Sequence, residues 1–552
     1  MSRRLFLATF GLVVVSPLLC AAEPASELTR KINESIAARQ TALGIRPSPL
    51  ADDSEYLRRV YLDLAGRIPG ADEVGTFLTE KSAEKRTQTV DRLLNDDRYV
   101  EHFANVWRHL LVPELMANVN IQAQNGNGFD GWLKKQIADN VRYDQFAREL
   151  LTVPFAAERI RGGKPAMNRP TESSPNDPSP SAFYTAKEAK PENLAASTAR
   201  ILLGVRIECA QCHDHPQGHW SREQFWSYAA FFAGLSRNPD NAGGGIREIF
   251  DKREMTIPGS STVVEAEFLG GGIPQWKFNV GSRVTLAEWV TAPDNPYFAK
   301  AAVNRLWAHF FGVGLVDPED DLRKDNPPSH PELLDELAKE FVAHGFDVQY
   351  LVRAITATDA YQRTSAVSEG ADLNPRAFTR MSLKRLTPEQ LFDSLAAATG
   401  YREPTTTPDP RVPVPVRGGA RGEFLNLFSS GVSSRTEVQL SIPQALLLMN
   451  GRFVSDALQT NNATLVDLAL KWTKLDTKTG SNAIYLATVV GDPKFDTAGR
   501  LESLFLATLS RKPTPAETEK LVRYVEGAND SKRALAGVFW MLLNSAEFIV
   551  NH

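Results

Sequence analysis

Hydrophobic positions recur at helical spacing through most of the chain. Leu57, Val60 and Leu64 follow one another at intervals of three and four residues, and residues 103–110 repeat the pattern. This spacing places apolar side chains on one face of a helix. It predicts that residues 26–160 are mostly helical.

Local signals mark where further helices begin and end. A helix is expected over residues 192–203, with Gly204 as its stop, because glycine tolerates the left-handed conformation that ends many helices. Capping-box sequences, in which Ser or Thr precedes Glu or Gln by three residues, predict three more helix starts. They occur at residues 221–224, 329–332 and 387–390.

Residues 236–285 have a different pattern. Glycine triplets flank residues 262–268, which carry strand-forming residues in partial alternation. We expect a small β insert here. The predicted fold class is therefore mainly α, with two helical halves, residues 23–235 and 286–552, on either side of the insert.

Two segments far apart in the chain resemble each other. Residues 61–73 and 505–517 both contain an aromatic residue followed by Leu, then Arg-x-Pro, then Glu. One interpretation is a structural duplication. The other is that both segments are ordinary helix starts, because Pro in the first turn and Glu after it are common there.

The composition is that of a protein that buries a core. Of the 552 residues, 42% are hydrophobic and 23% are charged. This length exceeds what a single core fills, so more than one folded unit is expected. The formal net charge is −4, from 62 Lys and Arg against 66 Asp and Glu. Because no basic stripe interrupts this balance, a nucleic-acid partner is not expected.

Residues 1–22 have the pattern of a signal peptide. Two arginines precede an apolar stretch, residues 5–19, and small residues favour cleavage after Ala22. A membrane anchor is the competing interpretation, but the stretch is short and contains Pro17. No later segment has about 18 consecutive apolar residues, so no membrane span is expected after cleavage. The predicted location is periplasmic or secreted.

The most specific motif is Cys209-Ala-Gln-Cys212-His213, which has the spacing of covalent c-type haem attachment. Two thiols three positions apart on one turn can each form a thioether with a haem vinyl group, and His213 then binds the haem iron. The motif occurs once, so one haem c is predicted. Five aromatic residues that follow are expected as apolar walls: Trp220, Phe225, Trp226, Phe231 and Phe232.

Other interpretations of this motif stay open. The cysteines could form a local disulfide or remain free thiols. With His213 and His215 or His219 they could bind zinc, which prefers four Cys or His ligands. The match to the haem motif could also be accidental. His215 is therefore a candidate ligand only for a non-haem metal.

Polar residues gather in the second half as well. Asp320 and Asp321, with His309 or His330, are candidates for acid–base catalysis or for binding a cation. Structural roles compete with this interpretation. His330 falls in the first turn of an expected helix, His309 falls on an amphipathic one, and the two acids could be ordinary loop residues. Whether the protein is an enzyme stays open.

Long segments of the chain resemble two known domains. Residues 209–216, with residues 56–69 upstream, are similar to the planctomycete cytochrome-like domain called domain of unknown function 1549. Residues 295–299, 304–312 and 326–334 resemble its usual partner, domain of unknown function 1553. The resemblance covers nearly all of the chain that follows the signal peptide.

The resemblance implies an exported, cytochrome-like protein for which no reaction is settled. Members are commonly encoded beside a sulfatase-like exported protein, which implies a polysaccharide or cell-envelope context. This chain departs from the family pattern at residues 217–219. His219 is therefore a poor candidate for a shared ligand role, whereas His213 and His215 remain good ones.

Three functional hypotheses follow. In the first, one c-type haem transfers electrons to a redox partner protein in the periplasm, in a role linked to carbohydrate metabolism. In the second, the protein is a haem-free hydrolase or lyase that depends on zinc or another metal. In the third, it is an interaction partner of the sulfatase-like exported protein, and the cysteines form a structural clip.

Overall fold

The computed structural model describes most of the chain, and the described part is mainly α-helical, as predicted. The described residues are 22–113, 119–157, 178–214, 220–237, 245–367, 374–401, 419–428, 489 and 493–552. The helices before the cysteine motif are α1 (Ala22–Ala42), α2 (Asp53–Leu64), α3 (Ala71–Thr79), α4 (Lys85–Leu94), α5 (Asp97–Leu111), α7 (Val119–Ala138), α8 (Tyr143–Thr152), α9 (Ser181–Ala186) and α10 (Pro191–Leu203).

The described residues after α10 contain further helices. Three short 3₁₀ turns are η2 (Glu208–Gln211), η3 (Ala230–Phe232) and η4 (Pro375–Ala377). The α-helices are α11 (Arg222–Ala229), α12 (Ser282–Val290), α13 (Phe298–Phe311), α14 (Pro331–Ala343), α15 (Val348–Thr356), α16 (Asp359–Gln362), α17 (Pro388–Thr399), α18 (Gly419–Phe428), α23 (Thr497–Leu509), α24 (Pro515–Glu526) and α25 (Ser531–Leu543).

The strands are short, and four of them fall where the β insert is predicted. These four are β2 (Leu235–Arg237), β3 (Ile246–Glu248), β4 (Glu254–Thr256) and β5 (Val263–Glu265). β1 (Ala156–Ala157) pairs in parallel with β3, which also pairs antiparallel with β2, and β4 and β5 form an antiparallel pair. β6 (Lys384–Arg385) pairs with β7 (Val550–Asn551) at the end of the chain.

Two of the three expected capping boxes are present. The Ser221 and Thr387 hydroxyls each accept a hydrogen bond from the backbone nitrogen three residues later. The side chain of the Gln at that later position accepts one from the backbone nitrogen of the Ser or Thr. The third prediction is wrong. α14 starts one residue later than expected, so His330 is its N-cap residue and the Ser329 hydroxyl contacts His330 Nδ1 at 3.0 Å instead of capping the helix.

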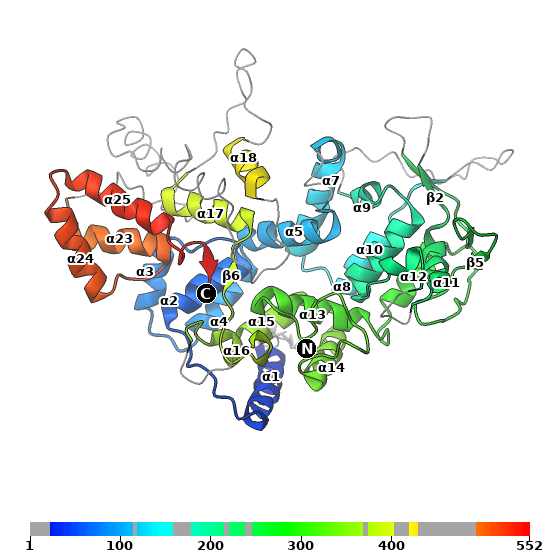
Figure 1. Ribbon diagram of the computed structural model, residues 1–552, viewed down its shortest axis with the longest axis horizontal. Coiled ribbons are helices and arrows are strands. Elements are labelled where there is room, and N and C mark those ends of the chain that lie inside the picture. The colour runs from blue at the N-terminus through cyan, green and yellow to red at the C-terminus, as the bar shows by residue number, and fades with distance from the viewer. Residues whose placement is uncertain are drawn as a thin grey trace, which may run out of the picture.

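Two hydrophobic cores divide the chain, but not at the β insert. The first core extends from Ala25 in α1 to Met381, so it includes residues on both sides of the insert. The second contains residues from Leu386 to Phe548, joined by Leu62 of α2 and by Ile68. The predicted arrangement in two helical halves is therefore not confirmed, because α1 packs on α14 and α15. Figure 1 shows α23–α25 at one end of the molecule, α11, β2 and β5 at the other, and α5 and α13 between them.

Helix α2 contains two buried arginines that bond to segments near the end of the sequence. Arg58 and Arg59 are fully buried. Arg58 donates to the carbonyl oxygens of Thr508 and Phe548, both at 2.9 Å. Arg59 donates to the carbonyl oxygen of His552 at 3.1 Å. These bonds satisfy backbone acceptors that would otherwise be buried without partners.

One turn later, α2 carries a buried carboxylate. Asp63 accepts hydrogen bonds from Lys384 Nζ at 2.6 Å, from Asn551 Nδ2 at 2.7 Å and from the Tyr361 hydroxyl at 2.9 Å. Lys384 also donates to two backbone carbonyls at the end of α13. This network joins α2, α13, β6 and β7 around a single charge pair.

The two similar segments adopt the same local structure. Gly66 follows α2 in the left-handed region with φ 68°, and Ser510 follows α23 there with φ 60°. In each case an Arg-x-Pro turn leads into the next helix. Glu73 and Glu517 then accept a hydrogen bond from the backbone nitrogen of their helix's N-cap residue, at 2.8 and 2.7 Å. These matches favour a structural duplication over two unrelated helix starts.

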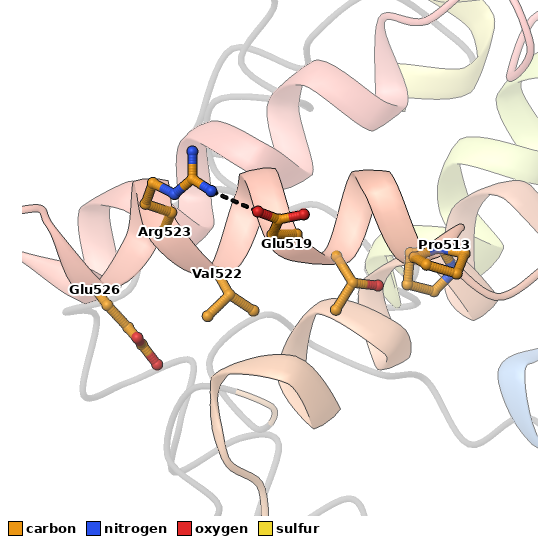
Figure 2. A pocket seen from close by; sticks show the side chains of 7 residues that line it. Pro513, Glu519, Val522, Arg523 and Glu526 are labelled. Carbon is orange, nitrogen blue, oxygen red and sulfur yellow. Dashed lines mark hydrogen bonds and ion pairs between the residues drawn. The ribbon is translucent and has the colours of Figure 1, made fainter.

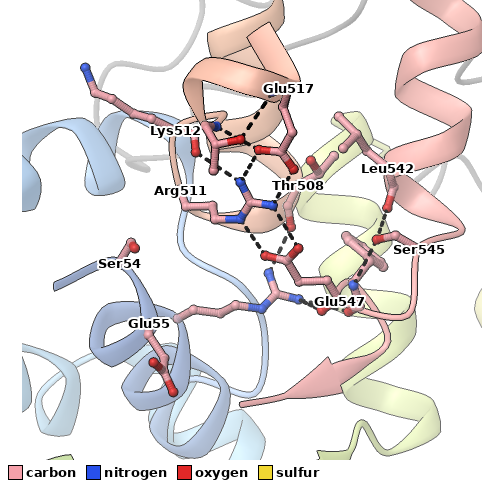
Figure 3. A network of polar contacts seen from close by, with 12 residues as sticks. Ser54, Glu55, Thr508, Arg511, Lys512, Glu517, Leu542, Ser545 and Glu547 are labelled. Atoms are coloured by element: carbon pink, nitrogen blue, oxygen red, sulfur yellow. Dashed lines mark hydrogen bonds and ion pairs between the residues drawn. The ribbon is translucent and has the colours of Figure 1, made fainter. Parts of the chain in front are cut away.

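Helices α4 and α25, which follow the two similar segments, also end in the same way. Asn95 and Asn544 cap α4 and α25, and each side chain donates to the carbonyl four residues earlier, at 2.8 and 2.9 Å. In the second of these regions, Arg511 links the turn after α23 to α24 and to the segment after α25. It donates to Glu517 at 2.9 and 3.0 Å and to Glu547 at 2.7 and 3.0 Å (Figure 3). These matches favour the interpretation that α2–α4 and α23–α25 arose by duplication of one three-helix unit.

Within the part of the chain that the structure describes, no helix combines the length and the apolar character needed to span a bilayer.

Candidate functional site

The cysteine motif lies immediately after α10. This helix starts with Pro191 at its first position and ends at Gly204, whose φ of 65° permits the left-handed C-cap. A side chain at this position would also meet Leu322 at 2.9 Å. The Gly204 carbonyl accepts a hydrogen bond from the Leu322 backbone nitrogen at 2.8 Å. The end of α10 therefore packs closely against the segment around Leu322.

Both thiols lie on the surface of the short turn that follows. η2 contains Cys209, and Cys212 comes directly after it. Both cysteines are exposed and neither forms a disulfide. Between them Ala210 is fully buried and anchors the turn on the core. The turn thus presents two accessible sulfur atoms outward from a fixed base.

His213 is oriented by its own backbone neighbour. Its side chain is exposed, and Nδ1 lies 2.8 Å from the carbonyl oxygen of Asp214. Because a carbonyl only accepts, Nδ1 must carry the hydrogen in this contact, which leaves Nε2 as the lone-pair nitrogen in the neutral ring. No described residue hydrogen-bonds Nε2. Histidines that bind a metal through Nε2 typically have the Nδ1 hydrogen bonded in this way.

Helix α11 holds the turn in place. Trp226 Nε1 donates to the Gln211 carbonyl at 3.1 Å. The backbone nitrogen of Arg222 donates to the Asp214 carboxylate at 2.8 Å, and the Arg222 guanidinium reaches the Gln211 carbonyl at 3.4 Å. No local pattern predicts this role for Arg222, because the contact depends on how α11 folds back.

Most of the aromatic side chains expected as haem walls lie in the core instead. Phe225, Phe231 and Phe232 are at most 1% exposed, and Phe231 stacks on Phe268 with ring centroids 5.3 Å apart. Trp226 is buried as well, and Trp220 is partly buried beside the core. Phe225, Trp226, Phe231 and Phe232 are therefore buried by the protein itself, whereas Trp220 is only partly buried.

The expected second site separates into contacts with structural roles. Asp320 accepts hydrogen bonds from Arg206 Nε at 2.8 Å and Nη2 at 2.5 Å. Arg206 lies between α10 and Cys209, so this pair ties the loop after α13 to the chain that leads into the turn. Asp321 pairs with Arg323 at 3.2 Å.

The two histidines of that predicted site are buried. His309 Nε2 lies 2.9 Å from the Asp63 carbonyl oxygen, inside the core. His330 is 3% exposed beside Phe378. Burial, with Arg39 and Arg376 nearby, lowers the pKa of His330 to about 4, so its ring is neutral near pH 7. Within the described ranges, no three His, Cys, Asp or Glu side chains form a metal-binding group. His215 lies outside those ranges.

A hollow of about 640 Å³ follows the exposed face of α24. Figure 2 shows that its lining comes from this helix and the loop before it, with Glu519 and Arg523 paired at 2.6 Å. It is open to solvent and its polar side chains do not converge on one point, so it does not indicate a binding or catalytic site.

Comparison with known proteins supports the domain combination suggested by the sequence. Residues 31–237 match the family described as Protein of unknown function (DUF1549), and residues 282–525 match Protein of unknown function (DUF1553). No curated protein matches the chain. No solved structure matches it either.

Proposed function

Because the chain belongs to the proteins that combine DUF1549 with DUF1553, we propose that it is an exported one-haem c-type protein that transfers electrons. Cys209 and Cys212 would form the two thioethers, and His213 would bind the iron. The observation that carries the proposal is the pairing of two exposed, unbridged thiols with a histidine whose Nε2 is left for a metal.

The donor set fits a c-type haem. Thioether formation needs both sulfur atoms accessible, and both are exposed on one turn. Axial ligation through Nε2 is favoured when Nδ1 is hydrogen-bonded, and the contact with Asp214 supports this. When bound, the haem would supply one-electron oxidation and reduction.

The aromatic surroundings argue for an exposed haem. Phe225, Phe231 and Phe232 are already packed in the core and do not form a slot beside the cysteines. Exposure to water is one of the factors that lower haem reduction potential. We therefore expect a low midpoint potential and a role as an electron donor to a partner protein. A carbohydrate-linked pathway and a sulfatase-like exported partner remain part of the proposal.

Variants of the motif test the proposal. The full chain is produced in a bacterial host with active cytochrome c maturation, and haem that survives denaturing electrophoresis is detected by its peroxidase activity. The wild type should retain haem, and the Cys209→Ala/Cys212→Ala variant should lose it. His213→Gln should keep any thioether but change the absorption spectrum, because the iron loses its protein ligand.

Arg206→Ala is the matched control. It removes a neighbouring charge but none of the atoms that would bind haem, so this variant should retain haem. A wild-type protein without covalent haem, alongside a control cytochrome that matures normally, would contradict the proposal. Bound zinc in that protein would favour the metal-dependent hydrolase instead.

A further inference from the structure

The histidine near the end of α5 forms a close pair with a buried carboxylate at the start of α17. His109 Nε2 lies 2.7 Å from Glu389 Oε1, and the two side chains are 38% and 4% exposed. This pair joins α5, which contributes to the first core, to α17, which contributes to the second, away from α11 (Figure 1). A carboxylate bonded to one ring nitrogen of an accessible histidine is also how many hydrolases orient their base.

Glu389 fixes the tautomer of this ring. Burial alone would raise the pKa of Glu389, but the hydrogen bond and the charge of His109 lower it to about 2. The carboxylate is therefore ionised near neutral pH and can only accept a hydrogen. In the neutral ring of His109, Nε2 then carries the hydrogen and Nδ1 carries the lone pair. Among the described residues, none hydrogen-bonds Nδ1. The pair thus leaves a proton acceptor on an accessible side chain.

The same histidine lines a cavity of about 260 Å³. Most of the lining is apolar and includes Phe103, Leu306 and Leu351, whereas Glu389 is not part of it. The lining side chains from the last two turns of α5 are partly exposed, so solvent reaches the cavity on that side. For comparison, an apolar cavity of about 150 Å³ is large enough to hold benzene. A small apolar group therefore fits beside His109.

A second pair of histidine and glutamate serves as a comparison within the molecule. His344 Nδ1 lies 2.9 Å from the Glu340 carbonyl oxygen and 3.5 Å from the Glu340 carboxylate. That carboxylate already binds Lys31 at 2.8 Å, and the His344 ring stacks on Tyr350. His344 is 32% exposed and does not line the cavity. It therefore matches His109 in exposure but not in surroundings.

We propose that His109 is a general base for the hydrolysis of esters whose small apolar acyl group enters this cavity, and that Glu389 is the positioning residue that holds its ring. Nδ1 takes a proton from water while the water oxygen bonds to the ester carbonyl carbon. The bond from that carbon to the alcohol oxygen then breaks, and His109 returns the proton to this oxygen. The products are the acid and the alcohol. Glu389 stabilises the imidazolium that exists between the two steps.

Hydrolysis of p-nitrophenyl butyrate by the full chain tests the proposal. The protein is produced without cytochrome c maturation, so that haem attachment and hydrolysis are judged separately. His109→Gln keeps a donor for Glu389 but removes the base, and it should lower kcat/KM about a hundredfold. Glu389→Gln should lower kcat at least about tenfold and leave KM unchanged, because the cavity still binds the acyl group. His344→Gln is the matched control and should retain the wild-type rate.

Variants that fill the cavity test the substrate class. Ala302→Phe and Val348→Phe place a ring inside it from α13 and α15, and each should raise KM for the butyrate ester while far-UV circular dichroism stays unchanged. Two substitutions are used so that a folding failure of one leaves the other informative. The proposal is overturned by a wild type no faster than His109→Gln, by an equal loss in His344→Gln, or by folded filling variants with unchanged KM.

Discussion

His330 should limit the stability of this protein in mild acid. Its ring is 3% exposed, Nδ1 contacts the Ser329 hydroxyl at 3.0 Å, and Nε2 is buried with no partner among the residues described. Burial, then the positive charges of Arg39 and Arg376, lower its pKa to about 4, although Glu332 acts in the opposite direction. A proton on this ring would be buried beside two cations.

The sign and size of the effect follow from this pKa. Above about pH 6.5, the ordinary pKa of histidine, the ring is neutral in both states and has no effect on the pH dependence. As the pH falls from about 6.5 to about 4, only the unfolded chain takes up the proton, so the free energy of unfolding decreases. Below pH 4 both states are protonated. The full loss is about 3 kcal/mol, since each pKa unit corresponds to about 1.4 kcal/mol.

The variant His330→Gln isolates this contribution. Urea unfolding of the full chain, followed by tryptophan fluorescence, gives the free energy of unfolding at pH 7 and pH 4.5. The decrease between these pH values should be about 2–3 kcal/mol smaller in the variant than in the wild type, whatever the substitution costs at pH 7. His344→Gln, at a half-exposed histidine, is the control and should retain the wild-type decrease. Equal pH dependence in the wild type and His330→Gln would refute the reasoning.

Two further predictions concern the buried and exposed charge pairs. Lys384→Met should lower the free energy of unfolding by about 3–5 kcal/mol, because it leaves the buried Asp63 carboxylate without its cation. Adding Asp63→Asn should restore part of this loss. A cost of Lys384→Met under about 1 kcal/mol in urea unfolding would contradict the prediction. Arg206→Ala should change stability by at most about 1 kcal/mol, since the pair with Asp320 is partly exposed.

Features that depend on a few neighbouring residues could be predicted from the sequence. The capping boxes at Ser221 and Thr387 and the stop at Gly204 depend on contacts within one turn, and all three are present. The box at Ser329 failed for an equally local reason. The backbone of His330, with φ −133° and ψ 83°, starts the helix one residue later and moves Ser329 out of reach.

Long-range packing could not be predicted in the same way. Periodicity shows which face of α1 is apolar, but not that this face packs on α14 and α15, about 300 residues away. For the same reason the core boundary lies near residue 385 and not at the β insert. A composition change marks a change of secondary structure, and it does not mark where a core ends.

The candidate site shows the same division. The spacing of Cys209, Cys212 and His213 is readable because it occupies one turn. The pair of Arg206 with Asp320 spans 114 residues, and only the fold explains why that acid lies where it does.

The central claim is that Cys209 and Cys212 hold one haem. The most direct test is the intact mass of the full chain, expressed with and without cytochrome c maturation and measured under denaturing conditions. Our account predicts that maturation adds the mass of one haem to the protein and that the adduct has a reducible c-type absorption spectrum. A protein with the same bare mass in both hosts, while a control cytochrome gains its haem, would contradict it.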